Sequence, residues 1–220
     1  MTSLHSLLDF VESNEISKKD MEAILGSISN NLQQTTQMFN NIMHWARSQF
    51  DSYEPDIVQV DLCEITEELN DEFMWQFKEK GVDITNNIDE GTNVMADKDM
   101  LTIVLRNLVS NALKFCEEYD SVTITTETQQ DEVAISVIDT GIGIDEEEQE
   151  KIFSNENYSS RGTENESGSG FGLKICREFV EMNNGKIRIN GNHGEGTTVT
   201  ITLPAAKETA HFPVEEREEV

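Results

Sequence analysis

Three polar residues interrupt an apolar run near the middle of the chain, in the stretch "RNLVSNALKF". Asn107, Asn111 and Lys114 are spaced by four and then three residues, which places them on one face of a helix. The apolar residues Val104, Leu108, Ala112 and Phe115 can then point elsewhere. Because a buried amide is costly unless it is hydrogen-bonded, these polar groups belong either to a satisfied internal network or to a ligand site.

A second group of residues follows an apolar, strand-like stretch, in the motif "DTGIGI". Gly141 and Gly143 permit a close approach of the backbone that a Cβ atom would block. Asp139, at the end of the strand, can accept a hydrogen bond from the amino group of a flat ligand, and adenine is the natural donor. A simple turn capped by the aspartate is an equally good reading of this motif alone.

Two further glycine motifs follow. In "GSGFGL", Gly168, Gly170 and Gly172 precede a predicted helix, whose N-terminus presents N–H groups and a positive dipole end to phosphate oxygens. In "GEGTT", residues 194–198, the glycines mark a turn between two strands. Taken singly, the first motif also fits a flexible linker and the second an ordinary hairpin.

The overall charge limits what the chain can bind. Its 220 residues include 43 acidic and 16 basic residues, a formal net charge of −27. This balance disfavours nucleic-acid binding, which depends on neutralising phosphates with cations. An anionic ligand must instead be held by local backbone N–H groups, a metal ion or a few focused cations.

No stretch is long and apolar enough for a membrane span, and the first residues lack the features of a secretory signal. We therefore expect no membrane contact by this part, although a longer parent protein with a membrane anchor is compatible with it. Cys63, Cys116 and Cys176 are far apart in helix-like sequence, which favours reduced structural thiols and a cytoplasmic location.

Hydrophobic periodicity divides the chain into a helical part and a mixed part. Residues 1–50 have apolar residues at alternating steps of four and three, typical of an antiparallel helical hairpin whose seam would pair in a dimeric four-helix bundle. Residues 51–206 predict an α+β domain, an α/β sandwich with a mixed sheet backed by helices. The composition of residues 207–220 predicts an acidic, flexible tail.

The mixed part has a clear order of elements. The predicted strands are 57–62, 83–88, 93–97, 121–128, 132–139, 186–190 and 197–203, and the predicted helices are 63–80, the one that carries "RNLVSNALKF", and 171–184.

The order Asn111 with Lys114, "DTGIGI", "GSGFGL" and "GEGTT" is more specific than any member of it. Over residues 56–204 it resembles the ATP-binding domain of histidine protein kinases, within the GHKL (Bergerat-type) ATPase superfamily. The helical hairpin resembles the C-terminal part of that family's dimerisation and phosphotransfer domain. The resemblance implies ATP and Mg²⁺ as cofactors, a homodimer, and a response-regulator receiver domain as partner.

The resemblance also implies a role for each motif residue. Asn111 would coordinate Mg²⁺ on the ATP phosphates with support from Asn107, and Lys114 would contact phosphate. Asp139 would accept the adenine amino hydrogen bond, above a floor shaped by Gly141 and Gly143, with Thr197 on the adenine side. The phosphates would lie on the helix start formed by Gly168, Gly170, Phe171, Gly172 and Leu173. Phe171 stands where leucine is usual, a change in volume that we expect packing to absorb.

Residues 145–169 would form a lid over the nucleotide. In this segment Phe153 would be the anchoring aromatic residue, and Arg161 would offer a cation to the γ-phosphate. The lid sequence resembles that of kinases that feed receiver domains.

The residue type at position 107 distinguishes ATP hydrolysis from phosphoryl transfer. Hydrolysing members of the superfamily carry a glutamate general base four residues before the magnesium-binding asparagine, and here that residue is Asn107. An amide cannot accept a proton, so phosphoryl transfer is favoured over hydrolysis. The alternative function is a nucleotide-binding dimeric regulatory module without kinase activity.

His5 is the histidine nearest to a phosphoacceptor position, but "HSLLDF" lacks the acidic, basic and proline residues that follow the family's phosphoacceptor. We expect that acceptor to lie a few residues before Met1, so that this chain holds ATP without phosphorylating itself. His5, His44 and His193 are then ordinary surface or packing residues. The sequence specifies neither the stimulus nor the particular response regulator.

Overall fold

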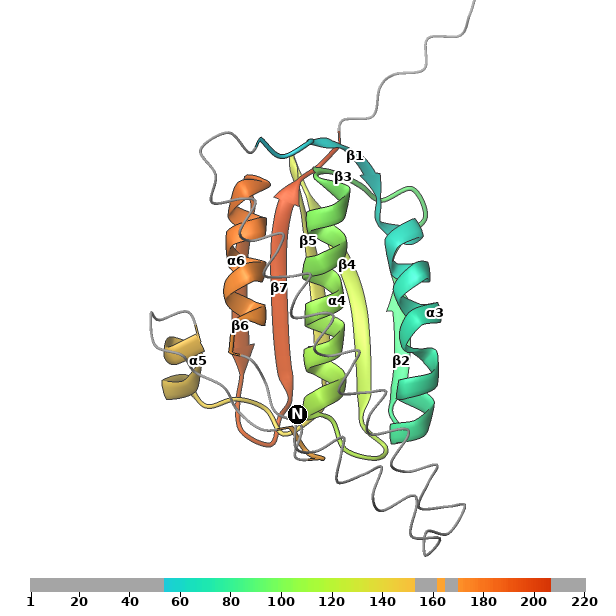
Figure 1. Ribbon diagram of the computed structural model, residues 1–220, viewed down its shortest axis with the longest axis vertical. Helices are drawn as coiled ribbons and strands as arrows, with labels where there is room; N and C mark the ends of the chain where they lie inside the picture. The colour runs from blue at the N-terminus through green and yellow to red at the C-terminus, as the bar shows by residue number, and fades with distance from the viewer. Residues whose placement is uncertain (1–53, 153–161, 165–169, 207–220) are drawn as a thin grey trace, which may run out of the picture. The chain divides into compact units, whose positions relative to one another are not determined.

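The computed structural model describes residues 54–152, 162–164 and 170–206 (Figure 1). The chain divides into two units, Met1–Asp51 and Ser52–Val220, and all the described residues belong to the second. Outside the described residues lie the predicted hairpin of residues 1–50, the tail 207–220, Phe153, Arg161 and Gly168. Among the described helices, none combines the length and the hydropathy that crossing a bilayer requires.

The helices and strands follow the predicted order. They are β1 (Val58–Asp61), α3 (Leu62–Lys80), β2 (Asp83–Asn87), β3 (Asn93–Ala96), α4 (Lys98–Phe115), β4 (Ser121–Gln129), β5 (Glu132–Asp139), α5 (Glu146–Ile152), α6 (Gly172–Met182), β6 (Lys186–Gly191) and β7 (Thr197–Pro204). Every predicted strand and helix between residues 57 and 203 is present. The short helix α5 was not predicted, because its sequence was assigned to the lid.

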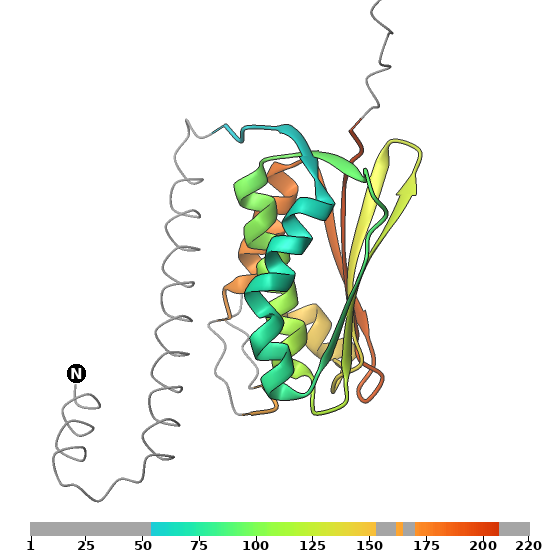
Figure 2. The same cartoon turned by 90° about the vertical axis from the view of Figure 1, so that its right-hand side faces the viewer.

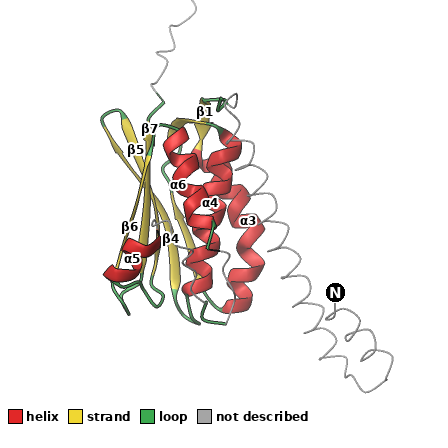
Figure 3. Cartoon of the chain, turned by 60° about the vertical axis from the view of Figure 1, so that its left-hand side comes forward, coloured by secondary structure: helices red, strands yellow, loops and turns green. Residues whose placement is uncertain are grey.

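The strands form a mixed sheet with helices on one face. The main sheet has the order β2-β4-β5-β7-β6, in which β2 and β4 are parallel and the other pairs antiparallel. Strands β1 and β3 form a separate antiparallel pair. Helices α3, α4 and α6 cover the same face of the main sheet, and α4 lies between the other two (Figures 2 and 3). The predicted α+β sandwich is therefore confirmed for this unit.

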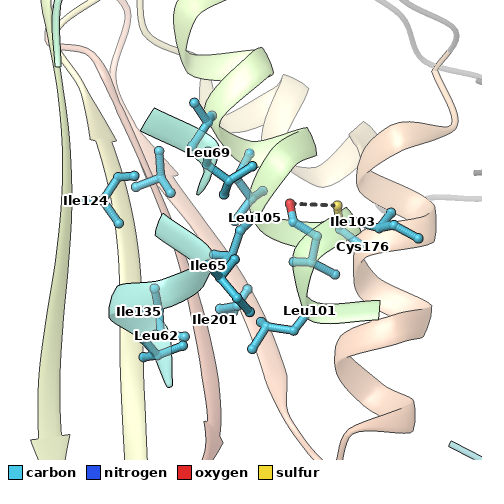
Figure 4. Close-up of a cluster of buried hydrophobic side chains, with 14 of the residues drawn as sticks. Leu62, Ile65, Leu69, Leu101, Ile103, Leu105, Ile124, Ile135, Cys176 and Ile201 are labelled. Carbon is cyan, nitrogen blue, oxygen red and sulfur yellow. Dashed lines mark hydrogen bonds between the residues drawn. The ribbon is translucent and has the colours of Figure 1, made fainter. Parts of the chain in front are cut away.

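The core lies between the three helices and the sheet. Along β5 the side chains alternate between buried and half-buried, so that Val133, Ile135 and Val137 face the helices. Ile135 pairs with Ile201 of β7, and Figure 4 shows both beside leucines of α3 and α4. Fully burying one such side chain stabilises the fold by about 1.5–3 kcal/mol.

The three cysteines are free thiols, as predicted, and Cys116 and Cys176 are buried. The Cys176 thiol donates to the carbonyl oxygen of Val104 at 3.8 Å and thereby links α6 to α4 (Figure 4). Burial raises the pKa of Cys116 and of Cys176 to about 12, so both are inert thiols.

Candidate functional site

A cavity of about 460 Å³ lies between the second half of α4, the start of α6 and the adjoining ends of β5 and β7. Its volume is in the range of small-molecule sites. The predicted site residues that line it are Asn107, Asn111, Lys114, Asp139, Gly143, Gly170, Gly172, Leu173 and Thr197. Gly141 and Phe171 do not line it. The fold thus brings together motifs that are up to 90 residues apart in the sequence.

The polar face of α4 is as predicted, but apolar residues share the cavity with it. Leu108, Ala112 and Phe115 also line the cavity, which corrects the expectation that they point elsewhere. Val104 is buried in the core, as expected. The cavity therefore has an apolar wall on α4 beside its polar groups, as a site for a flat heterocycle needs.

The two asparagines of α4 differ in their hydrogen bonds. The Asn107 side-chain amide nitrogen donates to the Ile103 carbonyl oxygen at 2.9 Å, which fixes the orientation of the Asn107 side-chain oxygen. The Asn111 side chain makes no hydrogen bond with any residue that the structure describes, although it is half-buried and lines the cavity. Asn111 is thus the asparagine whose polar atoms are available to a ligand. The Lys114 ammonium lies 4.7 Å from the centroid of the Phe115 ring.

Asp139 ends β5, and only 7% of it is exposed. Its Oδ1 accepts two backbone hydrogen bonds, from Gly141 N–H at 3.0 Å and from Thr197 N–H at 3.1 Å. No residue in the described ranges donates to its Oδ2. One carboxylate oxygen is therefore fixed by the protein, and the other is left for a donor in the cavity.

The environment of Asp139 changes its acidity. Burial raises its pKa from the ordinary 3.8 to about 6, since a charged carboxylate is disfavoured away from water. The two backbone N–H groups of Gly141 and Thr197 lower the pKa, and the charge of Asp120 raises it. A strongly shifted carboxyl group in a cavity is typical of functional sites.

The turn after Asp139 packs tightly on two neighbouring segments. The Ile142 N–H donates to the Phe115 carbonyl oxygen at 3.1 Å, at the end of α4. Gly143 has a φ of +72°, and a Cβ atom there would collide with the backbone carbonyl of Asn192. The Gly194 N–H donates to the Ile142 carbonyl oxygen at 2.7 Å. This turn therefore needs glycine at position 143 and is fixed by the loop between β6 and β7.

Helix α6 begins directly at the cavity. Phe171 is its N-cap residue, and no side chain caps the helix start. A Cβ atom on Gly172 would lie 3.1 Å from Asn107 Oδ1, so glycine allows α6 to start close against α4. The N–H groups of Gly172 and Leu173, in the first turn, have no partner within the helix and suit an anion. Phe171 is 41% exposed, so the larger side chain that stands here in place of the usual leucine needs little room in the core.

Other lining residues were missed from the sequence. Glu148 and Ile152 belong to α5, and Gln149 ties this helix to the sheet edge by donating to the Gly191 carbonyl oxygen at 2.8 Å. The acidic run after Asp145 was the available signal for a helix start. His193 is exposed, as predicted for a surface residue, but it also lines the cavity. The sequence signal for a place in the cavity lining was its position directly before the motif "GEGTT".

Among residues 54–152, 162–164 and 170–206, no three His, Cys, Asp or Glu side chains form a metal-ligand cluster. A metal ion in this cavity would therefore take an amide oxygen and ligand oxygens rather than a carboxylate cage. Asn111 fits Mg²⁺, which binds oxygen ligands and commonly keeps phosphate and water in its coordination sphere.

Comparisons with known proteins agree with this geometry. The family model described as "Histidine kinase-, DNA gyrase B-, and HSP90-like ATPase" matches residues 96–207, just over half of the chain. The adaptive-response sensory kinase SasA of Prochlorococcus marinus is 40% identical over 57% of the chain and 33% of its own length. The sensor histidine kinase WalK of Bacillus subtilis is 29% identical over 94% of the chain and 35% of its own length. The chain thus spans about a third of the length of these two relatives.

Solved structures of the histidine kinase ThkA show the same fold. Its nucleotide-free catalytic domain is 30% identical, with a TM-score of 0.59 over 68% of this chain and 95% of that one. Its complex with the response regulator protein TrrA is 24% identical, with a TM-score of 0.67 over 94% of this chain and 58% of that one, a likeness of fold alone. Because the family model matches more than half of its residues, the chain belongs to the histidine kinase-, DNA gyrase B- and HSP90-like ATPase family.

Proposed function

We propose that this chain is the catalytic core of a two-component sensor kinase, which holds Mg-ATP in the cavity and passes its γ-phosphoryl group to a histidine. The asymmetry of Asp139 carries the proposal. Two backbone N–H groups hold its Oδ1, and no described residue donates to its Oδ2. The adenine amino group supplies such a donor, whereas guanine presents a carbonyl oxygen in its place.

The phosphates lie at the α4–α6 side of the cavity in this proposal. Asn111 is the magnesium ligand, and Asn107, oriented by its bond to Ile103, supports it. Lys114 and the first N–H groups of α6 bind phosphate oxygens. Mg²⁺, when bound, neutralises charge on the phosphates and orients the γ-phosphoryl group for in-line attack.

Transfer is favoured over hydrolysis by the chemistry of α4. The residue one turn before Asn111 is Asn107, whose amide cannot take a proton from water. The carboxylates that line the cavity, Asp139, Asp145 and Glu148, come from β5 and the segment after it. Slow release of inorganic phosphate relative to transfer is the expected behaviour.

The acceptor and partners follow from the sequence motifs. His5 lacks the neighbouring acidic residue that activates a phosphoacceptor, so the acceptor is a histidine that this chain does not carry. In a longer protein that carries this histidine, a homodimer through the hairpin of residues 1–50 would present it, and a receiver domain would accept the phosphoryl group. The ThkA–TrrA complex supports such a partner. The reduced thiols favour a cytoplasmic location for these steps.

Calorimetric titration with ATP, with and without Mg²⁺, tests the binding step. We expect saturable binding of ATP that strengthens with Mg²⁺, and Asn111→Ala should remove most of that strengthening. Thr102→Ala is a matched control on α4, because the Thr102 hydroxyl donates to a helix carbonyl away from the cavity lining. Absence of ATP binding by the wild-type chain would refute the proposed function.

Incubation with γ-labelled ATP tests the transfer step. The chain alone should gain no acid-labile label, and a longer chain that contains the family's phosphoacceptor histidine should become labelled when the two are mixed. Label on this chain that disappears in His5→Gln would show that His5 is the acceptor. ATP binding without transfer to any histidine would instead favour the regulatory-module function.

Light scattering tests the homodimer. It should give the mass of two chains, and a single-chain mass at high concentration would contradict the homodimer.

A further inference from the structure

The C-terminal turn of α4 ends in carbonyl groups that three separate parts of the chain bind. A helix end leaves its last carbonyl oxygens without donors in the helix. The Lys80 ammonium, at the end of α3, lies 2.9 Å from the Leu113 oxygen and 3.1 Å from the Lys114 oxygen. The Ile142 N–H, in the turn after β5, donates to the Phe115 oxygen. The third part is Thr163, which lies between α5 and α6 in the sequence.

Thr163 binds this turn through two donors. Its backbone N–H donates to the Lys114 oxygen at 3.2 Å. Its hydroxyl lies 2.7 Å from the Cys116 oxygen and 3.3 Å from the Lys114 oxygen. Because a hydroxyl has one proton, the shorter contact to Cys116 is the main hydrogen bond. Thr163 therefore holds two carbonyl groups on either side of Phe115.

We infer that Thr163 is a positioning residue for the phosphate side of the nucleotide site, an inference that rests on the proposed function. Lys114 belongs to the turn that Thr163 holds, and Asn111 lies about one helical turn before it. Thr163 itself does not line the cavity. Its effect on a ligand passes through the backbone of α4, which fixes where the Asn111 and Lys114 side chains begin.

The adenine side of the cavity depends on other bonds. The Asp139 carboxylate is held by the N–H groups of Gly141 and Thr197. The turn after it is held by the Phe115 oxygen, which lies between the two carbonyl groups that Thr163 binds, and also by the Gly194 N–H, which donates to the Ile142 oxygen. None of these bonds includes Thr163. Loss of the Thr163 hydroxyl should therefore weaken binding of the phosphates more than binding of the base.

Thr163→Val and Thr163→Ser test this inference, since valine keeps the shape of threonine without its hydroxyl and serine keeps the hydroxyl. We expect Thr163→Val to weaken Mg-ATP binding about tenfold, the loss of roughly one buried hydrogen bond to the site's geometry. Adenosine binding should change less than about twofold, and Thr163→Ser should bind both ligands about as the wild type does. Thr92→Val is the matched control, because the Thr92 hydroxyl makes a bond of the same length, 2.7 Å, to the Asp89 oxygen outside the cavity lining.

Three outcomes would overturn the inference. Thr163→Val with wild-type affinity for Mg-ATP would show that the hydroxyl is not needed. An equal loss for Mg-ATP and adenosine, with a lower melting temperature, would show a general structural role. Equal losses in Thr163→Val and Thr163→Ser would exclude the hydroxyl as the cause. If Thr163→Val does not fold, Thr163→Ala takes its place in the same comparison. Failure of the wild-type chain to bind adenosine and Mg-ATP would refute the proposed function itself, a result separate from all of these.

Discussion

The two ends of the α4–α6 pair both contain buried polar groups, but they use them differently. The helices pack side by side in opposite directions: the residue before α4 contacts the residue after α6, and Asn107 of α4 lies against Gly172 at the start of α6 (Figure 1). One end is a closed cluster around Asp97 and Asn183. The other is the cavity with Asp139 and Asn111.

In the closed cluster, every side-chain oxygen has a donor. Asp97 is 6% exposed, and its two oxygens accept from Met100 N–H and Asp56 N–H, both at 3.1 Å. The Asn183 side chain accepts from Asp97 N–H at 2.6 Å and donates to the Phe179 oxygen at 2.7 Å. Such a satisfied cluster fixes the N-terminus of α4 and the C-terminus of α6.

At the cavity, equally buried groups are only partly satisfied. Asp139 is 7% exposed, close to the value for Asp97, yet the described residues bind only one of its oxygens. This difference distinguishes a structural carboxylate from one that binds a ligand. Burial is the same for both, and the number of oxygens left without a protein donor separates them. A binding carboxylate of this kind costs stability until its ligand arrives.

The largest effect is expected for Asp97→Ala. This change removes the N-cap of α4 and leaves the Asp56 N–H without its acceptor, so the free energy of unfolding should fall by about 3 kcal/mol. Urea denaturation measures the fall, and Mg-ATP affinity of the folded variant should remain within about twofold of the wild type.

Asp61→Ala is the matched control: Asp61 also caps a helix, α3, but it is exposed and makes a single cap bond. Its loss should cost about 1 kcal/mol. Equal costs for the two variants would remove the distinction drawn for the closed cluster.

Asp139→Asn should show the opposite pattern, a loss of affinity without a loss of stability. An amide replaces the charged acceptor, so ATP binding should weaken by about 2 kcal/mol, or roughly 30-fold. Calorimetry with ATP and GTP measures it, and the wild type should prefer ATP. The free energy of unfolding at pH 7 should not fall, because the variant no longer buries a charge. Equal wild-type affinity for ATP and GTP would show that Asp139 does not recognise the adenine amino group.

The pKa of Asp139 predicts how binding depends on pH. Because its pKa is raised from 3.8 to about 6, the folded protein keeps a proton that the unfolded chain loses between about pH 4 and 6. The contribution of this group to stability is therefore fully present below about pH 4 and is lost as the pH rises to about 6. Binding of adenine needs the ionised form, so ATP affinity should fall about tenfold between pH 7 and pH 5. Titrations across this range test it, and Asp139→Asn should lack this fall. The same fall in the variant would assign it to another group.

Local patterns in the sequence predicted much of the site and none of the long-range hydrogen bonds of the fold. The spacing of Asn107, Asn111 and Lys114 requires only a helix, and the place of Asp139 requires only a strand that ends there. Both follow from periodicity between near neighbours. The bond from Asp97 to Asn183 joins residues 86 apart, and it depends on how two helices pack, which no local pattern encodes.

Local sequence patterns also failed to predict the short helix α5. Helix α5 has seven residues, too few to be stable by propensity alone, and it is held by the bond from Gln149 to the sheet edge. The apolar residues Leu108 and Ala112 were predicted to face away from the polar group, but a cavity wall is wider than one helical stripe. The roles of Phe153, Arg161 and Gly168 stay predictions.

The smallest effect is expected at the exposed end of α6. Phe171 is 41% exposed, and its carbonyl oxygen accepts from Ile175 N–H at 3.0 Å, a bond that any residue can make. Phe171→Leu should therefore change the free energy of unfolding by less than about 0.5 kcal/mol and Mg-ATP affinity by less than about twofold. Phe179→Leu is the matched control on the same helix: Phe179 is fully buried near the closed cluster, and its replacement should cost more than about 1 kcal/mol. Urea denaturation and calorimetry of both variants give the comparison. A loss of more than about fivefold in affinity for Phe171→Leu would show that the ring itself contacts the nucleotide, and the start of α6 would then bind its ligand through a side chain as well as through backbone N–H groups.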